Sequence, residues 1–529
     1  MAEGGASFSL EYEASEPVAA CSSPVTAFVG RTLKGPLHRA VPIASFGDFQ
    51  RVFGGLWQPS TLSYAIEQFF ASGGAQAIVV RVANGGRAPT LTLPAGSAAL
   101  HLVGLQPGSR EYLRAAVDYD GIGADEALFN LVLQRVRSAG SERVEDQEIF
   151  RKASLQPQSD RYIVDLLLRS QLARVVPPLP EQRPQPTGSG PAGASVGYIM
   201  ANADGDDGEP ITDYDVIGSA LEDTGLFALR TVAFDFLCVP PLSRERDVGF
   251  GTLLVAARLC RERHALLIVD PPSAWTRPQD ALEAMRSWPF RSDHAVLYYP
   301  RVRAFDRLRG RFETFACCGA AAGLLARAEA RQPLAGAAEA EPILRAGLQP
   351  ATDISPAQRL RLAQAGINTL MAARSPELLP VSARTLATGG SGPADWRFLC
   401  ARRLGLRIAA AVERGTRWMV FAQNAPGTWA RGRSLVDAYL ARCAAEGAFA
   451  GASAQERYFV VCDERINPPD SIAAGRINLL FGIAARRAGQ FDAWLVCHQA
   501  ASSRTRAVSV NRWAAGAVSD ECCTVPLPH

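Results

Sequence analysis

A serine in a glycine-rich pentapeptide is the first candidate for catalysis in this chain. Gly193-Ala194-Ser195-Val196-Gly197 matches G-x-S-x-G, the nucleophile-elbow pattern. An elbow needs a strand before the serine and a helix after it, whereas here a Pro/Gly-rich segment precedes and strand-like residues follow. We therefore expect no catalytic role, and an α/β hydrolase-like enzyme using Ser195 stays an alternative.

Carboxylates gather between positions 204 and 215, where they could bind calcium: Asp204, Asp206, Asp207, Glu209, Asp213 and Asp215. Gly208 stands where an EF-hand loop requires a ligand, and no glutamate follows at the right distance. We expect instead a turn whose aspartates cap a helix near residues 214–221. The chain also lacks C-x-x-C, H-E-x-x-H and P-loop sequences. The sequence therefore predicts no metal, no cofactor and no enzyme.

Arginines dominate a predicted helix at residues 395–414. Arg403, Arg407 and Arg414 recur at helical spacing, with Arg402 beside them, and apolar residues occupy the other positions of the helical repeat. One interpretation is a solvated face in an arginine-rich protein. The other is a cationic ridge that docks an acidic partner.

Both ends of the chain show the period-2 pattern of a strand. Phe8, Leu10 and Tyr12 alternate with polar residues, as do Val508 and Val510. These segments are either frayed termini or strands that pair with the sheet edge of a neighbouring subunit.

Composition excludes several classes of protein. The 529 residues are 48% hydrophobic and 20% charged, which excludes wholesale disorder, and the net charge of +3 does not favour nucleic acid or a membrane surface. The start resembles no secretory signal, and no apolar run approaches the ~20 residues of a membrane span. The eleven cysteines show no disulfide or zinc spacing, so we expect a cytosolic chain with mostly buried free thiols.

Strand and helix patterns alternate over most of the chain, which predicts a largely parallel or mixed sheet. Strands are predicted at 25–30, 77–82, 232–239, 265–269, 295–299, 417–421, 458–462, 477–483 and 491–497. Helices are predicted at 46–53 with Ser45 as N-cap, and at 62–71, 244–263, 278–288, 356–365, 395–414 and 426–446. Residues 90–176 show short alternating runs typical of a β-rich domain, and residues 177–193 have the composition of a linker.

The predicted fold is an α/β core built from both ends of the chain, with an inserted β-rich domain and extended terminal arms. The predicted boundaries are an N-terminal arm at 1–23, a first part of the core at 24–86, and the inserted domain with its Pro/Gly linker at 87–193. A middle α/β part follows at 194–386, then a C-terminal core at 387–498 and a C-terminal arm at 499–529.

Short motifs run in order from about residue 24 to residue 500. They are PVTAFVGR (24–31), KGP (34–36), RVFGGLW (51–57), LSYA (62–65), QFF (68–70), VVRV (79–82), FLCVP (236–240), DPP (270–272), LYYP (297–300), AGIN (365–368), ARTL (383–386), DWR (395–397), GTRWMVF (415–421), TWAR (428–431), NPP (467–469) and GRIN (475–478). Together they resemble the contractile tail sheath proteins of phage tails, R-type pyocins and extracellular contractile injection systems.

The resemblance implies a structural subunit that polymerises helically around an inner tube. Contraction from a metastable extended state would drive the tube through a target envelope. The partners implied are further copies of the chain, the tube protein, and baseplate and terminator or cap proteins, with no direct contact to nucleic acid and no membrane insertion. Assembly would take place in the bacterial cytoplasm, and the chain would become a component of a phage virion or of an injection particle. A sheath-initiating or baseplate relative is a further alternative, but such relatives usually lack the inserted domain.

Overall fold

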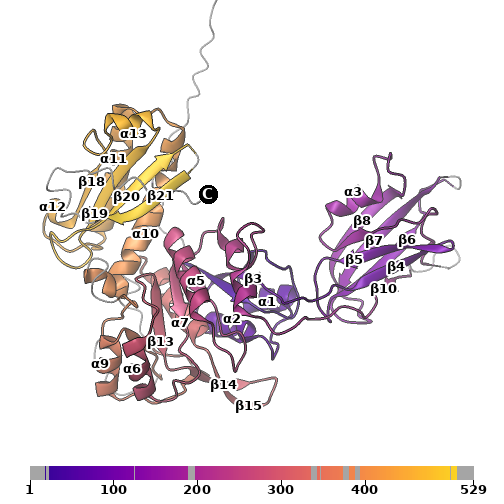
Figure 1. Cartoon of the computed structure of the whole chain (residues 1–529), viewed down its shortest axis with the longest axis horizontal. Coiled ribbons are helices and arrows are strands. Elements are labelled where there is room, and N and C mark those ends of the chain that lie inside the picture. The colour runs from indigo at the N-terminus through magenta and orange to yellow at the C-terminus, as the bar shows by residue number, and fades with distance from the viewer. Residues whose placement is uncertain are drawn as a thin grey trace, which may run out of the picture.

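The computed structural model shows three bodies joined in series (Figure 1). It describes Val18 and residues 23–123, 126–188, 197–334, 342–345, 347–372, 381–387, 394–500 and 502–508. A central α/β body is joined on one side to a β-rich domain through a narrow neck, and on the other side to a C-terminal domain (Figure 1).

A seven-stranded sheet organises the central body. Its order is β17-β13-β12-β11-β1-β3-β2, and every neighbouring pair is parallel except β2 with β3. The strands are β1 (Val25–Gly30), β2 (Val41–Ile43), β3 (Gln76–Arg81), β11 (Phe236–Cys238), β12 (Leu266–Val269), β13 (Ala295–Tyr299) and β17 (Ile367–Thr369). The largely parallel sheet is thus confirmed, although its strands come from residues 25–369 and not from both ends of the chain.

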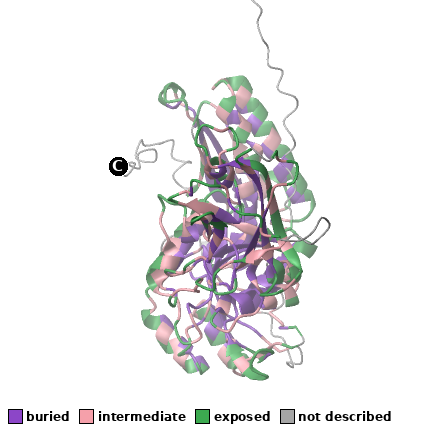
Figure 2. Cartoon of the chain, turned by 90° about the vertical axis from the view of Figure 1, so that its right-hand side faces the viewer, coloured by how far each residue is buried: buried purple, intermediate pink, exposed green. Residues whose placement is uncertain are grey.

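Two layers of helices cover this sheet because its strands carry apolar side chains on both faces. Alternate residues of β1 separate the layers, since Phe28 packs with one helix layer while Ala27 and Val29 pack with the other. The first layer holds α1 (Phe46–Phe53), α2 (Thr61–Ala71) and α7 (Cys318–Arg331), and the second holds α5 (Phe250–Glu262), α6 (Pro278–Ser287) and α9 (Pro356–Gln364). Buried residues accordingly run through the middle of the molecule (Figure 2).

A small antiparallel hairpin extends from the central body beyond β13. It consists of β14 (Val302–Asp306) and β15 (Arg311–Phe315), and β14 also pairs with β16 (Gln349–Pro350). The hairpin projects at the lower end of the molecule in Figure 1. Its base residues Val302 and Phe315 belong to the same apolar cluster as α2 and α7.

The β-rich domain packs two antiparallel sheets against each other. One sheet has the order β4-β5-β9 and the other β10-β6-β7-β8. Their strands are β4 (Thr90–Ala95), β5 (Ala98–Gly104), β6 (Tyr112–Asp118), β7 (Leu128–Val136), β8 (Val144–Ser154), β9 (Ala173–Val176) and β10 (Ile199–Met200), with α3 (Ile163–Leu168) beside them.

Two details of the predicted inserted domain are wrong. The described part of the expected linker packs on the domain, since the backbone N–H groups of Gln185 and Thr187 donate to the carbonyls of Pro94 and Val117 at 2.7 and 2.9 Å. Strand β10 follows the predicted boundary at Gly193 but still pairs with β6. Backbone hydrogen bonding thus recruits a Pro/Gly-rich segment that has little apolar surface of its own.

Two antiparallel backbone bridges form the neck. Asn84 pairs with Glu209, and Arg87 pairs with Asp206. The domain therefore leaves and re-enters the core at one place, as an insertion does.

The C-terminal domain has its own antiparallel sheet, in the order β18-β19-β20-β21. Its strands are β18 (Tyr458–Val461), β19 (Ile477–Ile483), β20 (Asp492–Gln499) and β21 (Ser502–Val508), packed on α10 (Leu399–Gly415) and α11 (Pro426–Ala445). The strand predicted at residues 417–421 is wrong, because this segment is the 3₁₀ helix η3 (Arg417–Phe421).

Candidate functional site

Helix α10 carries the arginines that the sequence singled out, and three of the four are buried. Arg403 donates from Nε to Glu329 Oε1 at 2.6 Å and from Nη2 to Asp235 Oδ1 at 2.5 Å. Arg407 donates from Nη1 to Glu329 Oε2 at 2.7 Å. These contacts tie α10 to α7 and to the residue that precedes β11, so they join the C-terminal domain to the central body.

Arg402 makes a second buried contact in the same region. Its Nη2 lies 2.8 Å from Asp293 Oδ2, and its guanidinium stacks 3.9 Å from the centre of the Trp396 ring. It also bonds His294 Nε2. Burial lowers the pKa of Arg402 to about 10, although the Asp293 carboxylate opposes this effect.

Despite its burial, the carboxylates of Glu329 and Asp235 raise the pKa of Arg403. Burial alone would lower the pKa of this guanidinium, but the two carboxylates more than offset burial and hold the pKa above its usual value. The group is therefore a permanently charged member of a buried ion cluster.

The predicted exposed ridge is thus wrong for Arg402, Arg403 and Arg407. All three are at most 4% exposed, and they pair within the chain, so they cannot face a partner. Apolar spacing identified one buried face, but α10 lies between two bodies and buries its polar positions too. Arg414 is exposed, so a tube-facing role for it stays a prediction.

The carboxylates of this cluster were not predicted from the sequence. Glu329 is 1% exposed near the end of the alanine-rich helix α7, and Asp235 lies between Phe234 and Phe236. A carboxylate within an apolar stretch is the sequence signal that indicates a buried cationic partner.

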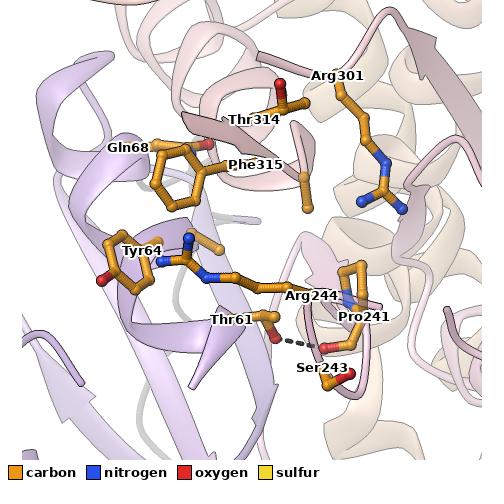
Figure 3. Close-up of a pocket in the computed structure, with 11 residues that line it drawn as sticks. Thr61, Tyr64, Gln68, Pro241, Ser243, Arg244, Arg301, Thr314 and Phe315 are labelled. Carbon is orange, nitrogen blue, oxygen red and sulfur yellow. Dashed lines mark hydrogen bonds between the residues drawn. The ribbon is translucent and has the colours of Figure 1, made fainter. Parts of the chain in front are cut away.

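A second polar cluster fills the crevice at the carboxyl ends of β1 and β11 (Figure 3). In doubly wound sheets, ligands often bind at the carboxyl ends of two neighbouring strands from which the chain continues in opposite directions along the sheet. Arg244 occupies the crevice, with its guanidinium 4.9 Å from the ring centres of both Tyr64 and Phe315. It bonds Asp306 Oδ2 at 2.7 Å and also Glu313.

The remaining space in this crevice is too small for a substrate. Its volume of about 20 Å³ corresponds to one water molecule. Burial, with help from Asp306, raises the pKa of Tyr64 to about 12, so its phenol stays protonated and donates to Asp306. The cluster therefore holds α2, β14 and the loop after β11 together.

The acidic residues at positions 204–215 make structural hydrogen bonds. At α4 (Asp213–Ile217) the N-cap is Thr212, and Asp215 accepts from its backbone N–H at 2.7 Å. An aspartate thus takes part in the cap as predicted, although the helix ends at Ile217 and not near residue 221. Asp213 accepts from Gly249 N at 2.8 Å and from Thr252 Oγ1 at 2.6 Å. In the described part of the chain, no group of His, Cys, Asp or Glu side chains has the arrangement of a metal site.

Ser195 lies outside the described residues. The residues after it form β10, a strand of an antiparallel sheet, and not the helix that a nucleophile elbow requires. The described residues that follow Ser195 therefore do not supply the helix of an elbow.

Of the five residues predicted to lie in the linking arms, only Val508 belongs to the described part of the chain. Val508 ends β21 and pairs with Ala493 of the same chain, so β21 belongs to this subunit's own sheet, and pairing of Val508 with a neighbouring subunit stays a prediction. β21 has ladder hydrogen bonds to β20 and lies at the edge of the sheet. Phe8, Leu10, Tyr12 and Val510 lie outside the described residues.

The start of the chain is attached to the C-terminal domain through Val18. This residue is 2% exposed, and its carbonyl accepts from Arg442 Nη2 at 2.7 Å. A Cβ atom on Gly415 would approach the Val18 side chain to 2.5 Å, so only glycine allows this contact. Val18 therefore lies against α10 and α11.

Within the described residues, none of the helices combines the length and the apolar character that crossing a bilayer requires.

Three solved structures with the same fold are described as sheath proteins. The sheath tail protein Lin1278 of Listeria innocua is 12% identical, with a TM-score of 0.60 over 92% of this chain and 97% of that one. The contracted sheath of the extracellular contractile injection system PVC is 16% identical, with a TM-score of 0.51 over 93% and 96%. The contracted helical sheath of the anti-feeding prophage is 17% identical, with a TM-score of 0.51 over 93% and 98%. No protein-family model and no curated protein sequence matches this chain.

Proposed function

We propose that this chain is the structural subunit of a contractile sheath. The observation that carries the proposal is the match to Listeria innocua Lin1278, which extends over 92% of this chain and 97% of that one. It includes all three bodies, so the likeness is not limited to the common α/β core. The sequence motifs that resemble sheath proteins are spread over the same length.

In this proposal the chain polymerises helically around an inner tube protein. A heterologous contact that does not close into a ring propagates as a helix. The extended sheath is metastable, and repacking of the same subunits into a shorter, wider arrangement drives the tube through a target envelope. Baseplate and terminator or cap proteins bind at the two ends, and assembly takes place in the bacterial cytoplasm before the virion or injection particle is released.

The internal ties of the subunit fit a body that moves without unfolding. The arginine cluster on α10 joins two bodies, and the Arg244 cluster fixes β14 to α2. The predicted linking arms, at residues 1–23 and 499–529, would keep neighbouring subunits attached while these bodies rotate. Backbone pairing at the open edge of the β18–β21 sheet is one way for such arms to bind. Arg414 is the candidate for contact with the tube.

The non-enzymatic role is part of the same proposal. The crevice where α/β enzymes bind ligands is filled by Arg244, Tyr64 and Phe315, and the described residues after Ser195 form a strand and not the helix of an elbow.

Negative-stain electron microscopy of the purified full chain tests the proposal. We expect hollow, transversely striated tubes. A monodisperse particle that hydrolyses a nitrophenyl ester, with the activity lost in Ser195→Ala, would instead establish the hydrolase alternative.

A further inference from the structure

The β14–β15 hairpin presents an apolar face surrounded by positive charge. Phe305 and Phe312 pair across the strands with ring centres 5.6 Å apart, and each is 52% exposed. Leu308, in the turn between the strands, is 50% exposed. The exposed charged side chains of the hairpin are all arginines, namely Arg303, Arg307, Arg309 and Arg311. We call these residues the cationic hairpin.

The carboxylates of the same hairpin neutralise its arginines only in part: Glu313 pairs with Arg309 at 3.0 Å and with Arg311 at 2.7 Å, but the hairpin has four exposed arginines against two carboxylates. Asp306 and Glu313 both bond Arg244, which lies beneath the hairpin. Their side chains are 0% and 12% exposed, whereas Arg307 is 78% exposed. The outer face of the hairpin is therefore positive.

A second exposed apolar surface carries the opposite charge. Tyr214 in α4 is 85% exposed, and Leu221 in the following loop is 97% exposed. Glu222 and Asp223 come directly after Leu221 and are exposed; Asp223 pairs with Arg230 at 3.6 Å, whereas Glu222 has no ion pair within the described residues. Two hydrogen bonds between Ser219 and Thr224 close this loop, so its shape is fixed. We call Tyr214, Leu221, Glu222 and Asp223 the acidic patch.

The two surfaces belong to opposite faces of the central sheet. The base of the cationic hairpin packs in the cluster that contains Phe28, α2 and α7. Val216 of α4 and Leu226, just after the acidic loop, pack in the cluster that contains Ala27, Val29 and α5. Since the seven-stranded sheet lies between the clusters, one copy presents both surfaces outward in different directions.

We propose that the cationic hairpin of one copy docks on the acidic patch of a second copy. Exposed aromatic side chains and arginines are the residues that protein interfaces favour, and the charges around the two apolar surfaces are complementary. Because the surfaces differ, the contact is heterologous and leaves one hairpin and one patch free for further copies. This inference rests on the proposed function, for which it supplies a contact that propagates the polymer.

Reciprocal charge reversal tests this contact in the full-length protein. Arg307→Glu changes the hairpin, where the nearest intrachain carboxylate, Glu67, is 3.9 Å away. Glu222→Arg changes the patch. We expect each variant alone to self-associate about tenfold more weakly than the wild type in sedimentation velocity, since like charges then face each other.

A mixture of the two variants distinguishes this contact from every other one. In a 1:1 mixture, each hairpin finds a patch of opposite charge on the other variant, so association should return to the wild-type level. Arg143→Glu, an exposed arginine in the β-rich domain, is the matched control and should associate like the wild type. Leu360→Ser should also be neutral, whereas Phe305→Ser with Phe312→Ser should weaken association, although Leu360 and both phenylalanines are each 52% exposed.

Two outcomes would overturn the contact. One is wild-type association of both charge variants, which would assign the hairpin to a different partner, and the other is failure of the mixture to recover. Microscopy of the same samples reports separately on the proposed function. Association that follows the charge pattern but produces closed rings would support the contact and contradict the sheath.

Discussion

At the scale of single residues, the charges of this protein hold its bodies together. Arg403, Arg407 and Glu329 form a buried cluster in which no member has bulk water to replace a lost partner. Removing one partner of a buried pair leaves an uncompensated charge, which costs far more than the loss of a surface pair.

Arg403→Met should therefore lower the free energy of unfolding by about 3–5 kcal/mol. Arg414→Met changes an exposed arginine on the same helix and should cost less than about 1 kcal/mol. Urea denaturation followed by circular dichroism measures both values. Equal effects of the two substitutions would mean that the buried cluster does not stabilise the junction.

His498 makes the C-terminal domain sensitive to acid. Burial lowers the pKa of His498 to about 4, from 6.5 in the unfolded chain, while the ring bonds Thr416 Oγ1 at 2.9 Å and Ser503 Oγ at 2.8 Å. The unfolded chain therefore binds the proton more tightly. The stabilising contribution is complete above pH 6.5, is lost as the pH falls from 6.5 toward 4, and amounts to about 3 kcal/mol.

Thermal unfolding between pH 7 and pH 4 tests this expectation. His498→Gln should remove part of the pH dependence, because glutamine does not titrate. His101→Gln, at an exposed position of β5, should leave the dependence unchanged. An identical slope in the wild type and in His498→Gln would exclude His498 as a source of the acid sensitivity.

At the scale of elements, the sequence predicts those helices and strands whose ends are set by nearby residues. It does not predict elements whose conformation depends on packing against distant parts of the chain. Helix α1 has the predicted bounds because Ser45 accepts from Asp48 N and Gly54 ends the helix at φ 89°, and both signals lie within the helix ends. The segment 417–421 has the composition of a strand but forms a 3₁₀ helix on which Met419 alone is buried. Predicting the 3₁₀ helix would have required knowledge of the residues that pack against this segment.

The arginine helix shows why the candidate site was harder to predict than the fold. Helical spacing places Leu404 and Ile408 in a core, which is correct. The opposite face meets Glu329 from a helix far away in the sequence, and no local pattern contains that partner. The sequence shows that α10 is rich in arginine, but only the packing of the C-terminal domain on the central body shows that Arg403 and Arg407 are buried.

The N-terminal arm gives a prediction at this scale. Val18 is a fixed point on the C-terminal domain, so deletion of residues 1–16 should leave the fold and its thermal unfolding unchanged. If the arm pairs with a neighbouring subunit, the truncated chain should form only short sheaths. Val18→Ser should instead lower the thermal stability, because it loosens the anchor itself. Tubes of normal length from the truncated chain would contradict the arm model.

At the scale of the whole molecule, the β-rich domain is attached at one place. Its polypeptide enters and leaves through Arg87 and Asp206, whose backbone groups already bond each other at 3.0 and 3.2 Å. Further contacts between domain and core are polar, including Lys34 with Glu145 and the Arg81 guanidinium with the Pro107 carbonyl. Within the described residues, the apolar cluster of the domain contains no residue of the core, and polar contacts of this kind do not decide whether the core folds.

Replacing residues 88–205 with a two-residue Asn-Gly turn should therefore give a soluble core that still assembles into tubes, since paired ends at this separation suit a hairpin turn. Arg81 loses one carbonyl acceptor, so some loss of thermal stability is expected. Deletion of residues 90–176, the β-rich segment predicted from the sequence, is the matched control. It removes β6 but keeps β10, which then has no partner strand, and it should aggregate. Microscopy and thermal unfolding of both products decide the matter, because a folded core that forms no tubes would show that the domain takes part in the lattice.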